Sequence, residues 1–265
     1  MHRRTSFVAI LLCALPVVGA EEARVAAPAP AAAPDWVVLI GAGALAAPSY
    51  PGASSFSVLP VPYIDVRYRN LFFCSPLSGL GVNAIATERL QAGVAVLPEF
   101  GRSESSGDRL RAWGDLGMGA GVKVFAGYDI GPVALVADAR RQVGAGGGTL
   151  IAAGIARTFF VSRRVILFSR ATLTWADARY ASAYFGVDGG QSTAALSQGQ
   201  IVPVYFAHAG LRDATLALLA VIPVDQRWSV QTFLRTELLL GDAASSPVTE
   251  QRIQPALGGV LAFRL

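Results

Sequence analysis

A period-two alternation of apolar residues with small or polar ones constrains this chain more than any other feature. It is clearest between residues 115 and 129, in the stretch DLGMGAGVKVFAGYD. One face carries Leu116, Met118, Ala120, Val122, Val124, Ala126 and Tyr128. The other carries Asp115, Gly117, Gly119, Gly121, Lys123, Gly127 and Asp129, with Phe125 as the one large exception. Successive side chains of a β-strand point to opposite faces, so this stretch predicts a strand with one apolar face.

The same alternation recurs along the chain and predicts a series of strands. The expected strands are 36–46, 56–69, 71–75 with 79–85, 88–101, 113–129, 132–141, 149–160, 164–176, 201–210, 212–222, 227–240 and 252–265. Counted this way, with 71–75 and 79–85 as one strand, they number 12, and single-chain bacterial barrels have an even number of strands. Ten is the alternative, because Pro76 and Gly79 interrupt the stretch from Leu71 to Ala86.

The two faces favour a membrane barrel over a soluble sandwich. The non-apolar face mixes glycines with sparse charges of both signs, and the chain has 53% hydrophobic but only 15% charged residues. A transmembrane barrel turns its apolar face to lipid, and its closure removes the sheet edges that lipid cannot hydrogen-bond. After the N-terminal region no segment has 18 consecutive apolar residues, as a membrane-spanning helix requires. We therefore expect an all-β, transmembrane antiparallel barrel of the outer membrane.

Aromatic residues and connecting segments add detail to this expectation. Aromatic residues predicted near strand ends, where interface aromatics belong, are Tyr63, Tyr68, Phe72, Phe73, Tyr128, Trp175, Tyr180 and Trp228. The short connections 129–132 and 161–164 are typical of periplasmic turns, and 103–108 and 180–199 of loops on the outer face. The segment 180–199 is long enough to fold into the mouth or lumen and narrow it.

The N-terminal region divides into two segments that precede the barrel. Residues 1–20 have the two arginines, the apolar stretch and the small residues of a cleaved secretory signal. Residues 21–35 alternate alanine and proline, which predicts an extended, solvated periplasmic tether. The barrel is expected to comprise residues 36–265.

Charged residues on the non-apolar faces are candidates to line the lumen. They are Asp65, Arg67, Arg69, Glu99, Asp115, Lys123, Asp138, Arg140, Arg235 and Glu237. One interpretation is a mixed-charge constriction that selects small solutes. The other is that these charges pair across a small lumen and keep it closed, which we favour because a barrel of this size holds little besides its own side chains.

Several function classes find no support in the residues. Beyond the signal, the chain has one histidine, His208, and one cysteine, Cys74, too few for a structural zinc site. No Gly-x-Ser-x-Gly motif accompanies His208, so we predict no enzyme, no metal and no cofactor. The stretch GAGALAA from Gly41 spells a dinucleotide fingerprint, but the prolines that follow leave no room for the helix such a site needs. Basic residues are not clustered with aromatics, so nucleic-acid binding is not expected.

Three segments resemble the MipA/OmpV family of outer-membrane proteins: Tyr50–Asn83, Thr174–Ser192 and Leu239–Arg252. The positions that match the family's motifs are Tyr50, Pro51, Gly52, Tyr184, Phe185, Gly186, Val187, Gln191, Ser192, Gly241, Asp242, Ser246 and Pro247. The chain departs from the pattern at Cys74 and at its last residue, Leu265, where barrels usually carry an aromatic. The resemblance implies an outer-membrane barrel.

The resemblance also implies a role. The namesake of the family is similar to a scaffold that bridges a murein lytic transglycosylase, MltA, to a bifunctional penicillin-binding protein. We therefore expect a non-catalytic scaffold in peptidoglycan remodelling, with outer-membrane lipid, a murein hydrolase and a murein synthase as partners. Other members are described as porin-like or adhesive, so a narrow channel and a surface adhesin stay open as alternatives.

Overall fold

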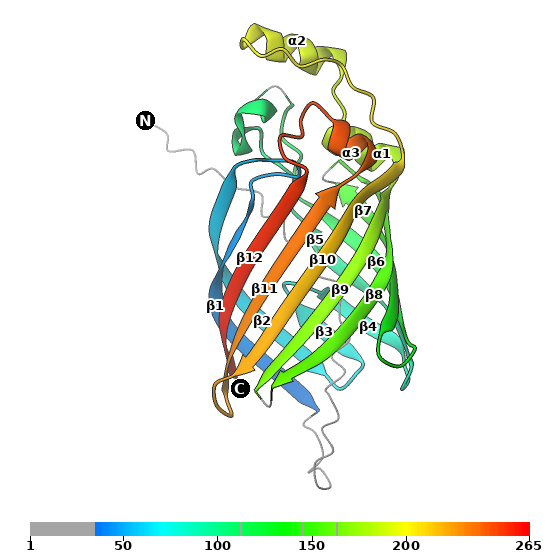
Figure 1. The fold of residues 1–265 in the computed structure, drawn as a ribbon, viewed down its shortest axis with the longest axis vertical. Coiled ribbons are helices and arrows are strands. Elements are labelled where there is room, and N and C mark those ends of the chain that lie inside the picture. Colours follow the sequence, from blue (N-terminus) through cyan, green and yellow to red (C-terminus); the bar gives the residue numbers. More distant parts are fainter. Residues whose placement is uncertain (1–34, 112, 145, 163) are drawn as a thin grey trace.

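The chain forms a closed antiparallel barrel of 12 strands in the computed structural model, which describes residues 35–111, 113–144, 146–162 and 164–265. Each strand pairs with its sequence neighbours, and β1 closes the ring against β12 (Figure 1). The strands are β1 (Trp36–Pro48), β2 (Phe56–Tyr68), β3 (Phe72–Ser75), β4 (Gly79–Ala86), β5 (Leu90–Glu99), β6 (Gly119–Asp129), β7 (Ala134–Gly144), β8 (Gly148–Ser162), β9 (Val165–Ala176), β10 (Gly210–Pro223), β11 (Trp228–Leu239) and β12 (Ile253–Arg264). The expected fold class and strand number are confirmed.

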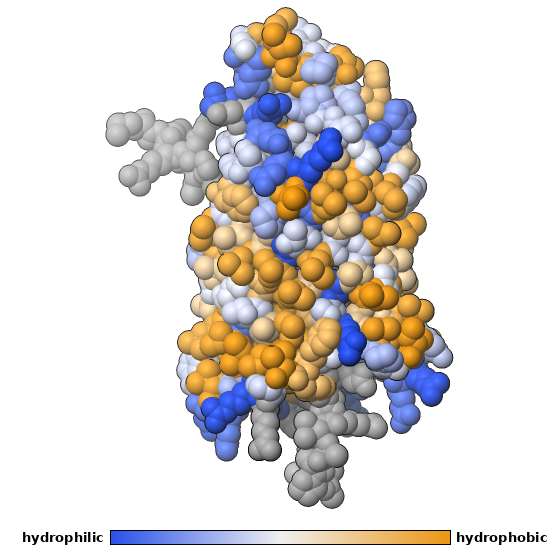
Figure 2. Space-filling view, in the orientation of Figure 1, coloured by the Kyte–Doolittle hydropathy of each residue, from blue (hydrophilic) through white to orange (hydrophobic). Residues whose placement is uncertain are grey.

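The alternation in the sequence sorts apolar residues to the outside of the barrel. In β6, Val122 and Val124 are 48% and 57% exposed, whereas Lys123 between them is 1% exposed. Hydrophobic residues cover most of the wall on the face seen in Figure 2, and hydrophilic residues gather toward its two ends. A soluble protein buries its apolar face, so this inverted arrangement is that of a membrane-spanning barrel.

The two ends of the barrel differ in their connections. One end carries the chain's C-terminus and short turns, among them residues 69–71, 130–133 and 224–227. The other carries the helices α1 (Ala178–Phe185), α2 (Gly189–Ser197) and α3 (Gly241–Ser245) and two short 3-10 helices, Glu104–Ser106 and Asp108–Leu110 (Figure 1). The segments 129–132 and 161–164 thus lie at the opposite end from 103–108 and 180–199, as the sequence predicts.

Two expected strands are wrong, although the total is right. The stretch 71–85 is two strands, because the chain reverses at residues 76–78, where the Ser75 hydroxyl accepts a hydrogen bond from the Ser78 backbone N–H. The stretch 201–210 is not a wall strand; it pairs through a single bridge between Tyr205 and Val187. Its two buried residues, Val202 and Ala207, pack in the cap and do not follow a period-two pattern. The expected strand 113–129 begins only at Gly119.

Aromatic pairs mark the end that carries the short turns. The rings of Trp36 and Tyr68 lie 4.6 Å apart, and those of Trp228 and Phe263 4.9 Å apart. Such rings belong at a membrane interface. Three of the residues expected there lie inside instead: Tyr63, Phe73 and Tyr180 are at most 7% exposed. The alternation puts Tyr63 and Phe73 on inward positions, and Tyr180 belongs to α1.

The glycines of GAGALAA have a packing role in β1. A Cβ on Gly41 or Gly43 would collide with the carbonyl oxygens of Leu261 and Gly259 in β12. These glycines therefore allow β1 and β12 to approach where the barrel closes.

No helix within the described part of the chain is both long and apolar enough to cross a membrane. The predicted signal, and the tether apart from Asp35, lie outside the described residues.

Candidate functional site in the lumen and its cap

The structure brings most of the predicted lumen residues together inside the barrel. Eight of the ten lie on inward-facing positions: Asp65, Arg67, Glu99, Lys123, Asp138, Arg140, Arg235 and Glu237. Arg69 lies instead in the exposed turn after β2 and pairs with Asp35. Asp115 lies in the loop between β5 and β6, where it accepts hydrogen bonds from Ser103 and Glu104. Both depart from the expectation because β2 ends before Arg69 and β6 begins after Asp115.

One polar network joins β5, β6, β7 and β9. Arg140 Nε lies 3.3 Å from Glu99 Oε1, and Gln142 donates to Glu99 Oε2 at 2.8 Å. Arg170 donates to Asp138 at 2.8 Å. Lys123 lies among these groups with its Nζ 5.6 Å from the centre of the Phe125 ring, and no other described group hydrogen-bonds to that nitrogen.

A second network lies close to the cap and is centred on Arg212. Its guanidinium pairs with Asp213 at 2.8 Å and with Glu237, and donates to the Tyr180 hydroxyl at 3.0 Å. Arg235 also pairs with Glu237, at 2.6 Å. A bulge in β10 between Leu211 and Asp213 turns two successive side chains inward. Bulges re-aim side chains in this way.

A third, smaller network lies at β2. Arg67 makes a two-pronged ion pair with Asp65, at 2.9 and 3.1 Å. The Tyr63 hydroxyl lies 3.0 Å from Gln231 Oε1 and 3.3 Å from Asp65 Oδ2. With the other two networks, it pairs most charges inside the barrel with opposite ones, and Lys123 is the exception among the described lumen residues.

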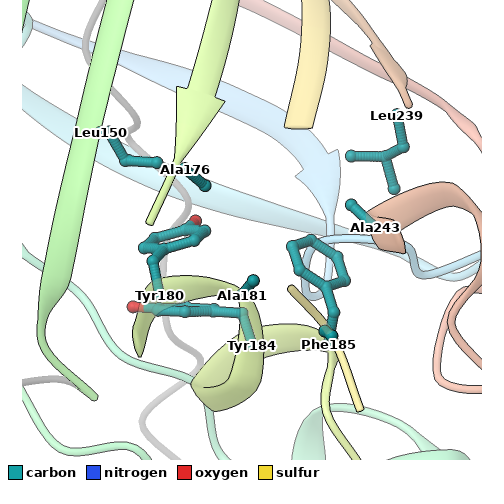
Figure 3. Close-up of a cluster of buried hydrophobic side chains, with 9 residues drawn as sticks. Leu150, Ala176, Tyr180, Ala181, Tyr184, Phe185, Leu239 and Ala243 are labelled. Carbon is teal, nitrogen blue, oxygen red and sulfur yellow. The ribbon is translucent and has the colours of Figure 1, made fainter. Parts of the chain in front are cut away.

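Helix α1 lies across the end of the barrel above these networks. Tyr180 and Tyr184 stack with their ring centres 4.4 Å apart, and Phe185 faces Leu239 and Ala243 (Figure 3). The Asp177 side chain begins the helix by accepting from the Tyr180 backbone N–H at 2.8 Å. Because Arg212 contacts the Tyr180 hydroxyl, α1 is tied to the second network. The long loop therefore folds over the mouth, as its length predicts.

A second cluster joins four loops into one cap. Its buried members are Tyr50, Ala53, Leu110, Trp113, Val187, Ala195, Val202 and Val248. Trp113 Nε1 donates to the Gly186 carbonyl at 3.1 Å, and the Ser246 hydroxyl donates to the Phe185 carbonyl at 2.6 Å. The buried Arg102 guanidinium donates to the Tyr184 carbonyl at 3.2 Å. The loops thus hold α1 from above.

All the positions that carry the family resemblance lie in this cap. The Tyr50 hydroxyl donates to the Val248 carbonyl at 3.3 Å, and the backbone N–H of Gly52 donates to Gln254 at 3.1 Å. Gly52 has φ +98°, and a side chain there would press on Thr249, so only glycine fits. Gln191 completes the capping box of α2 with Asp188, and Ser192 donates to the Val202 carbonyl at 2.7 Å. The family-motif residues are therefore residues that build the cap.

Electrostatics in the cap favour charged groups that are held by hydrogen bonds. Burial lowers the pKa of Arg102 to about 10, which still leaves it protonated at neutral pH. The backbone N–H of His208 donates to Asp242 at 2.7 Å and lowers the pKa of that carboxyl below its usual value of 3.8. Burial alone would raise the pKa of Asp177, but the hydrogen bond from the Tyr180 N–H helps to hold it low. These groups fix loops in place.

The arrangement offers little for catalysis or metal binding. His208 Nδ1 lies 3.0 Å from Asp242 Oδ2, but its side chain is 79% exposed and no described hydroxyl hydrogen-bonds to it. Cys74 is a free, half-buried thiol in β3. Within the described ranges no group of three or more His, Cys, Asp or Glu is arranged to hold a metal ion.

Sequence reasoning missed several residues of the networks. Arg170 and Gln142 lie on the polar faces of alternating strands, so the same period-two reading would have found them. Arg212 and Asp213 are different, because two adjacent residues face the same side only at a bulge. Arg102 lies in a loop, and no periodic signal marks it.

Solved structures of outer-membrane proteins show weak similarity to this chain. Among solved structures, the NanC porin covers 86% of this chain and 100% of its own, with 8% identity and a TM-score of 0.43. The COG4313 outer membrane channel from Pseudomonas putida F1 covers 90% and 99%, with 10% identity and a TM-score of 0.39. These similarities are weak, and nothing about this chain's function follows from them. A comparison with curated protein sequences found no match.

A family model supplies the informative match. The model of the MltA-interacting protein MipA matches residues 40–265, which includes every strand of the barrel except the first residues of β1. The chain belongs to the MipA family.

Proposed function

We propose that this protein is a non-catalytic scaffold of the outer membrane that binds a murein lytic transglycosylase and brings it to a murein synthase of the penicillin-binding type. The family description, an MltA-interacting protein, supports the first partner. The pairing of the lumen charges and the position of α1 are the structural observations that carry the proposal. Because charges inside the barrel are paired and α1 lies across its mouth, the barrel is better suited to anchoring a partner than to conducting solutes.

The end with the short turns is the proposed binding surface. By the general rule for bacterial barrels this end faces the periplasm, where peptidoglycan enzymes act. Apolar side chains are exposed there, including Leu71, Ile130 and Val224, at 55%, 50% and 60%. The Asp35–Arg69 ion pair and the hydrogen bond from Arg69 N–H to the Asp35 carbonyl hold the start of β1 at this end. Asp35, the last residue of the predicted tether, therefore lies beside the turns, and we propose that the tether contributes to binding.

Crosslinking in intact envelopes tests the scaffold. We expect the protein to recover a lytic transglycosylase and a penicillin-binding synthase, and recovery to fall when Leu71, Ile130 and Val224 are replaced by serine. Ile201, 91% exposed at the opposite end, provides the matched control, since Ile201→Ser leaves the short-turn end unchanged. Recovery of no murein enzyme by the wild-type protein would overturn the proposal.

A narrow channel is the second candidate, because charges of both signs line the interior. The paired state of these charges argues for a closed lumen. Planar-bilayer recordings separate the two functions: a scaffold gives no conductance steps, whereas regular steps that change with Lys123→Gln would establish a channel.

A further inference from the structure

The wall of the barrel is incomplete between β2 and β5 in the half that lies nearer the cap. Strand β3 pairs with β2 only at Val66, Arg67 and Tyr68, and β4 pairs with β5 only up to Val96. Residues 56–65 of β2 and 97–99 of β5 therefore have no strand partner on these sides in the described chain. Figure 1 shows β3 and β4 confined to the half away from the helices. At the usual spacing, two missing strands correspond to about 10 Å of wall.

The free edge of β5 has a proline where a donor would otherwise face this unpaired segment. A Cβ on Gly81 would lie 2.7 Å from the carbonyl oxygen of Val94, and one on Gly79 would collide with that of Val96. The backbone groups of these even-numbered residues thus point toward β4. Alternate residues of a strand direct their backbone groups to the same side. Pro98 is next in this series, so its nitrogen, which lacks a hydrogen, points past the end of β4.

The free edge of β2 has two prolines in the same role. A Cβ on Gly43 would collide with the carbonyl oxygen of Gly259, so that carbonyl points toward β1, where its partner is Ala44. The backbone groups of Ala44 therefore face β12 and not β2. Ala44 lies opposite Pro60, whose backbone groups consequently point away from β1, and Pro62 shares this direction. Both prolines face the unpaired segment.

The inner face beside the unpaired segment is apolar, unlike the rest of the lumen. Leu45 is buried with Ala47 and Ala256, and Val61 and Phe233 pack against this cluster. Leu59 and Val61 sit on inward positions of β2 but are only half-buried. On the outer face, Phe56, Val58 and Ile64 of β2 are 50%, 72% and 54% exposed. Apolar surface thus lies on both sides of one edge.

The unpaired segment is bounded above and below. On the cap side, a Cβ on Gly107 would lie 2.7 Å from the Tyr50 ring, so the β1–β2 and β5–β6 loops meet there. On the other side, the turn at residues 76–78 closes the wall. The short turns at the opposite end face the periplasm by the general rule, so the unpaired segment lies in the outer-leaflet half of the membrane.

We propose that the acyl chain of an outer-leaflet lipid inserts between the edges of β2 and β5 and lies against the half-buried apolar side chains of Leu59, Val61 and Phe233 on the inner face. A hydrocarbon chain supplies no hydrogen bonds, and a backbone N–H left without a partner in lipid is unfavourable. The three prolines remove three such N–H groups, while Phe56, Val58 and Ile64 of β2 keep theirs on the same side. The prolines also disfavour a strand from a second copy, which would lose hydrogen bonds at each proline.

Quenching by lipids brominated on their acyl chains tests this site. On a Cys74→Ser background, Val61→Cys labelled with a small fluorophore is reconstituted into vesicles of brominated or ordinary phospholipid. Val122→Cys, on the lipid-facing side of β6, gives the reference for full contact with acyl chains. Thr172→Cys, an inward and half-buried position in β9, gives the matched control for the lumen. We expect the brominated lipid to reduce the fluorescence of the label at 61 about as much as that at 122, and to leave 172 nearly unchanged.

The outcomes distinguish a membrane phospholipid from a free fatty acid as the source of the acyl chain, and a gel assay controls for folding. Each variant is used only if it shows the heat-dependent gel shift of the parent barrel. Fluorescence at 61 that matches 172 in brominated vesicles overturns the proposal. Quenching at 61 by added brominated fatty acid in ordinary vesicles, without quenching by brominated phospholipid, also overturns it, since the occupant would then be a free amphiphile. Lipid insertion is independent of the scaffold role, because crosslinking to murein enzymes does not report on position 61.

Discussion

At the scale of residues, the interior of this barrel depends on how its buried charges are paired. Asp213 and Glu237 are 1% and 2% exposed, and both pair with Arg212. Burying a pair of charges gains little over an apolar core of the same shape, but removing one partner is costly. Arg212 is therefore the residue whose loss the barrel tolerates least.

We expect Arg212→Met to lower the free energy of unfolding by about 3–5 kcal/mol, because it removes the ion pair of buried Asp213 and leaves buried Glu237 with Arg235 alone. Urea unfolding in lipid vesicles, followed by tryptophan fluorescence, measures this loss. The matched control is Arg141→Met, which removes an ion pair with Asp177 from a half-exposed arginine. That variant should lose about 1 kcal/mol or less. Equal losses in the two variants would contradict the role of Arg212.

Asp242 makes the stability of the cap depend on pH in the acidic range. Its pKa is held below 3.8 by the His208 backbone N–H. A lowered pKa contributes stability that is fully present above the unfolded value and is lost as pH falls through the folded value. We therefore expect pepsin cleavage within residues 199–209 to increase as the pH falls below about 4. Asp242→Asn carries no titrating group, so its cleavage should show a weaker pH dependence; an unchanged profile would rule Asp242 out.

At the scale of elements, the short hairpin of β3 and β4 is the main irregularity of the wall. Pro76 and Gly79, which made the strand count ambiguous, are the residues at which the chain reverses. The reversal leaves a long free edge on β2, residues 56–65, and a short one on β5, residues 97–99, which must not pair with other chains. Pro60, Pro62 and Pro98 provide that protection.

Replacing Pro60, Pro62 and Pro98 together by valine restores three N–H groups on the free edges. We expect the triple variant to form more crosslinked dimers in detergent than the wild type, because edge strands with free donors pair with one another. Pro132→Val, in the turn between β6 and β7, is the control and should stay as monomeric as the parent. A triple variant no more dimeric than this control would show that the prolines do not protect the edges.

At the scale of the whole molecule, the two ends of the barrel are built for different tasks. One end has short turns with exposed apolar residues, and the other has a cap of four loops packed on α1. Between the two ends, the outer wall carries an apolar belt suited to contact with the membrane (Figure 2). This asymmetry predicts one orientation in the membrane.

Labelling of intact cells checks that orientation. On a Cys74→Ser background, we expect Ile201→Cys at the cap end to react with a membrane-impermeant maleimide from outside. Val224→Cys, in the turn after β10, should react only after the cells are permeabilised. Both positions are exposed, at 91% and 60%, so access to the reagent and not burial decides the result. The reverse pattern would invert the barrel and move the proposed partner surface outside.

The barrel fold and the facing of its wall residues could be predicted from the sequence, because the side-chain alternation of a strand is a local property. It was enough to place Lys123, Arg140 and Glu237 inside and Val122 and Val124 outside. It was not enough for the segment 201–210, whose buried residues pack against loops distant in the sequence.

The side-chain contacts inside the barrel and in its cap depend on the tertiary fold. Arg212 reaches Glu237 because a bulge turns it inward, and the bulge depends on the strands on both sides of β10. The cap brings together Tyr50, Trp113, Phe185 and Ser246, which come from four separate loops. The contacts among these groups depend on the strand register and on the closure of the whole barrel. Both are set by long-range strand pairing, so they cannot be read from any one stretch of the chain.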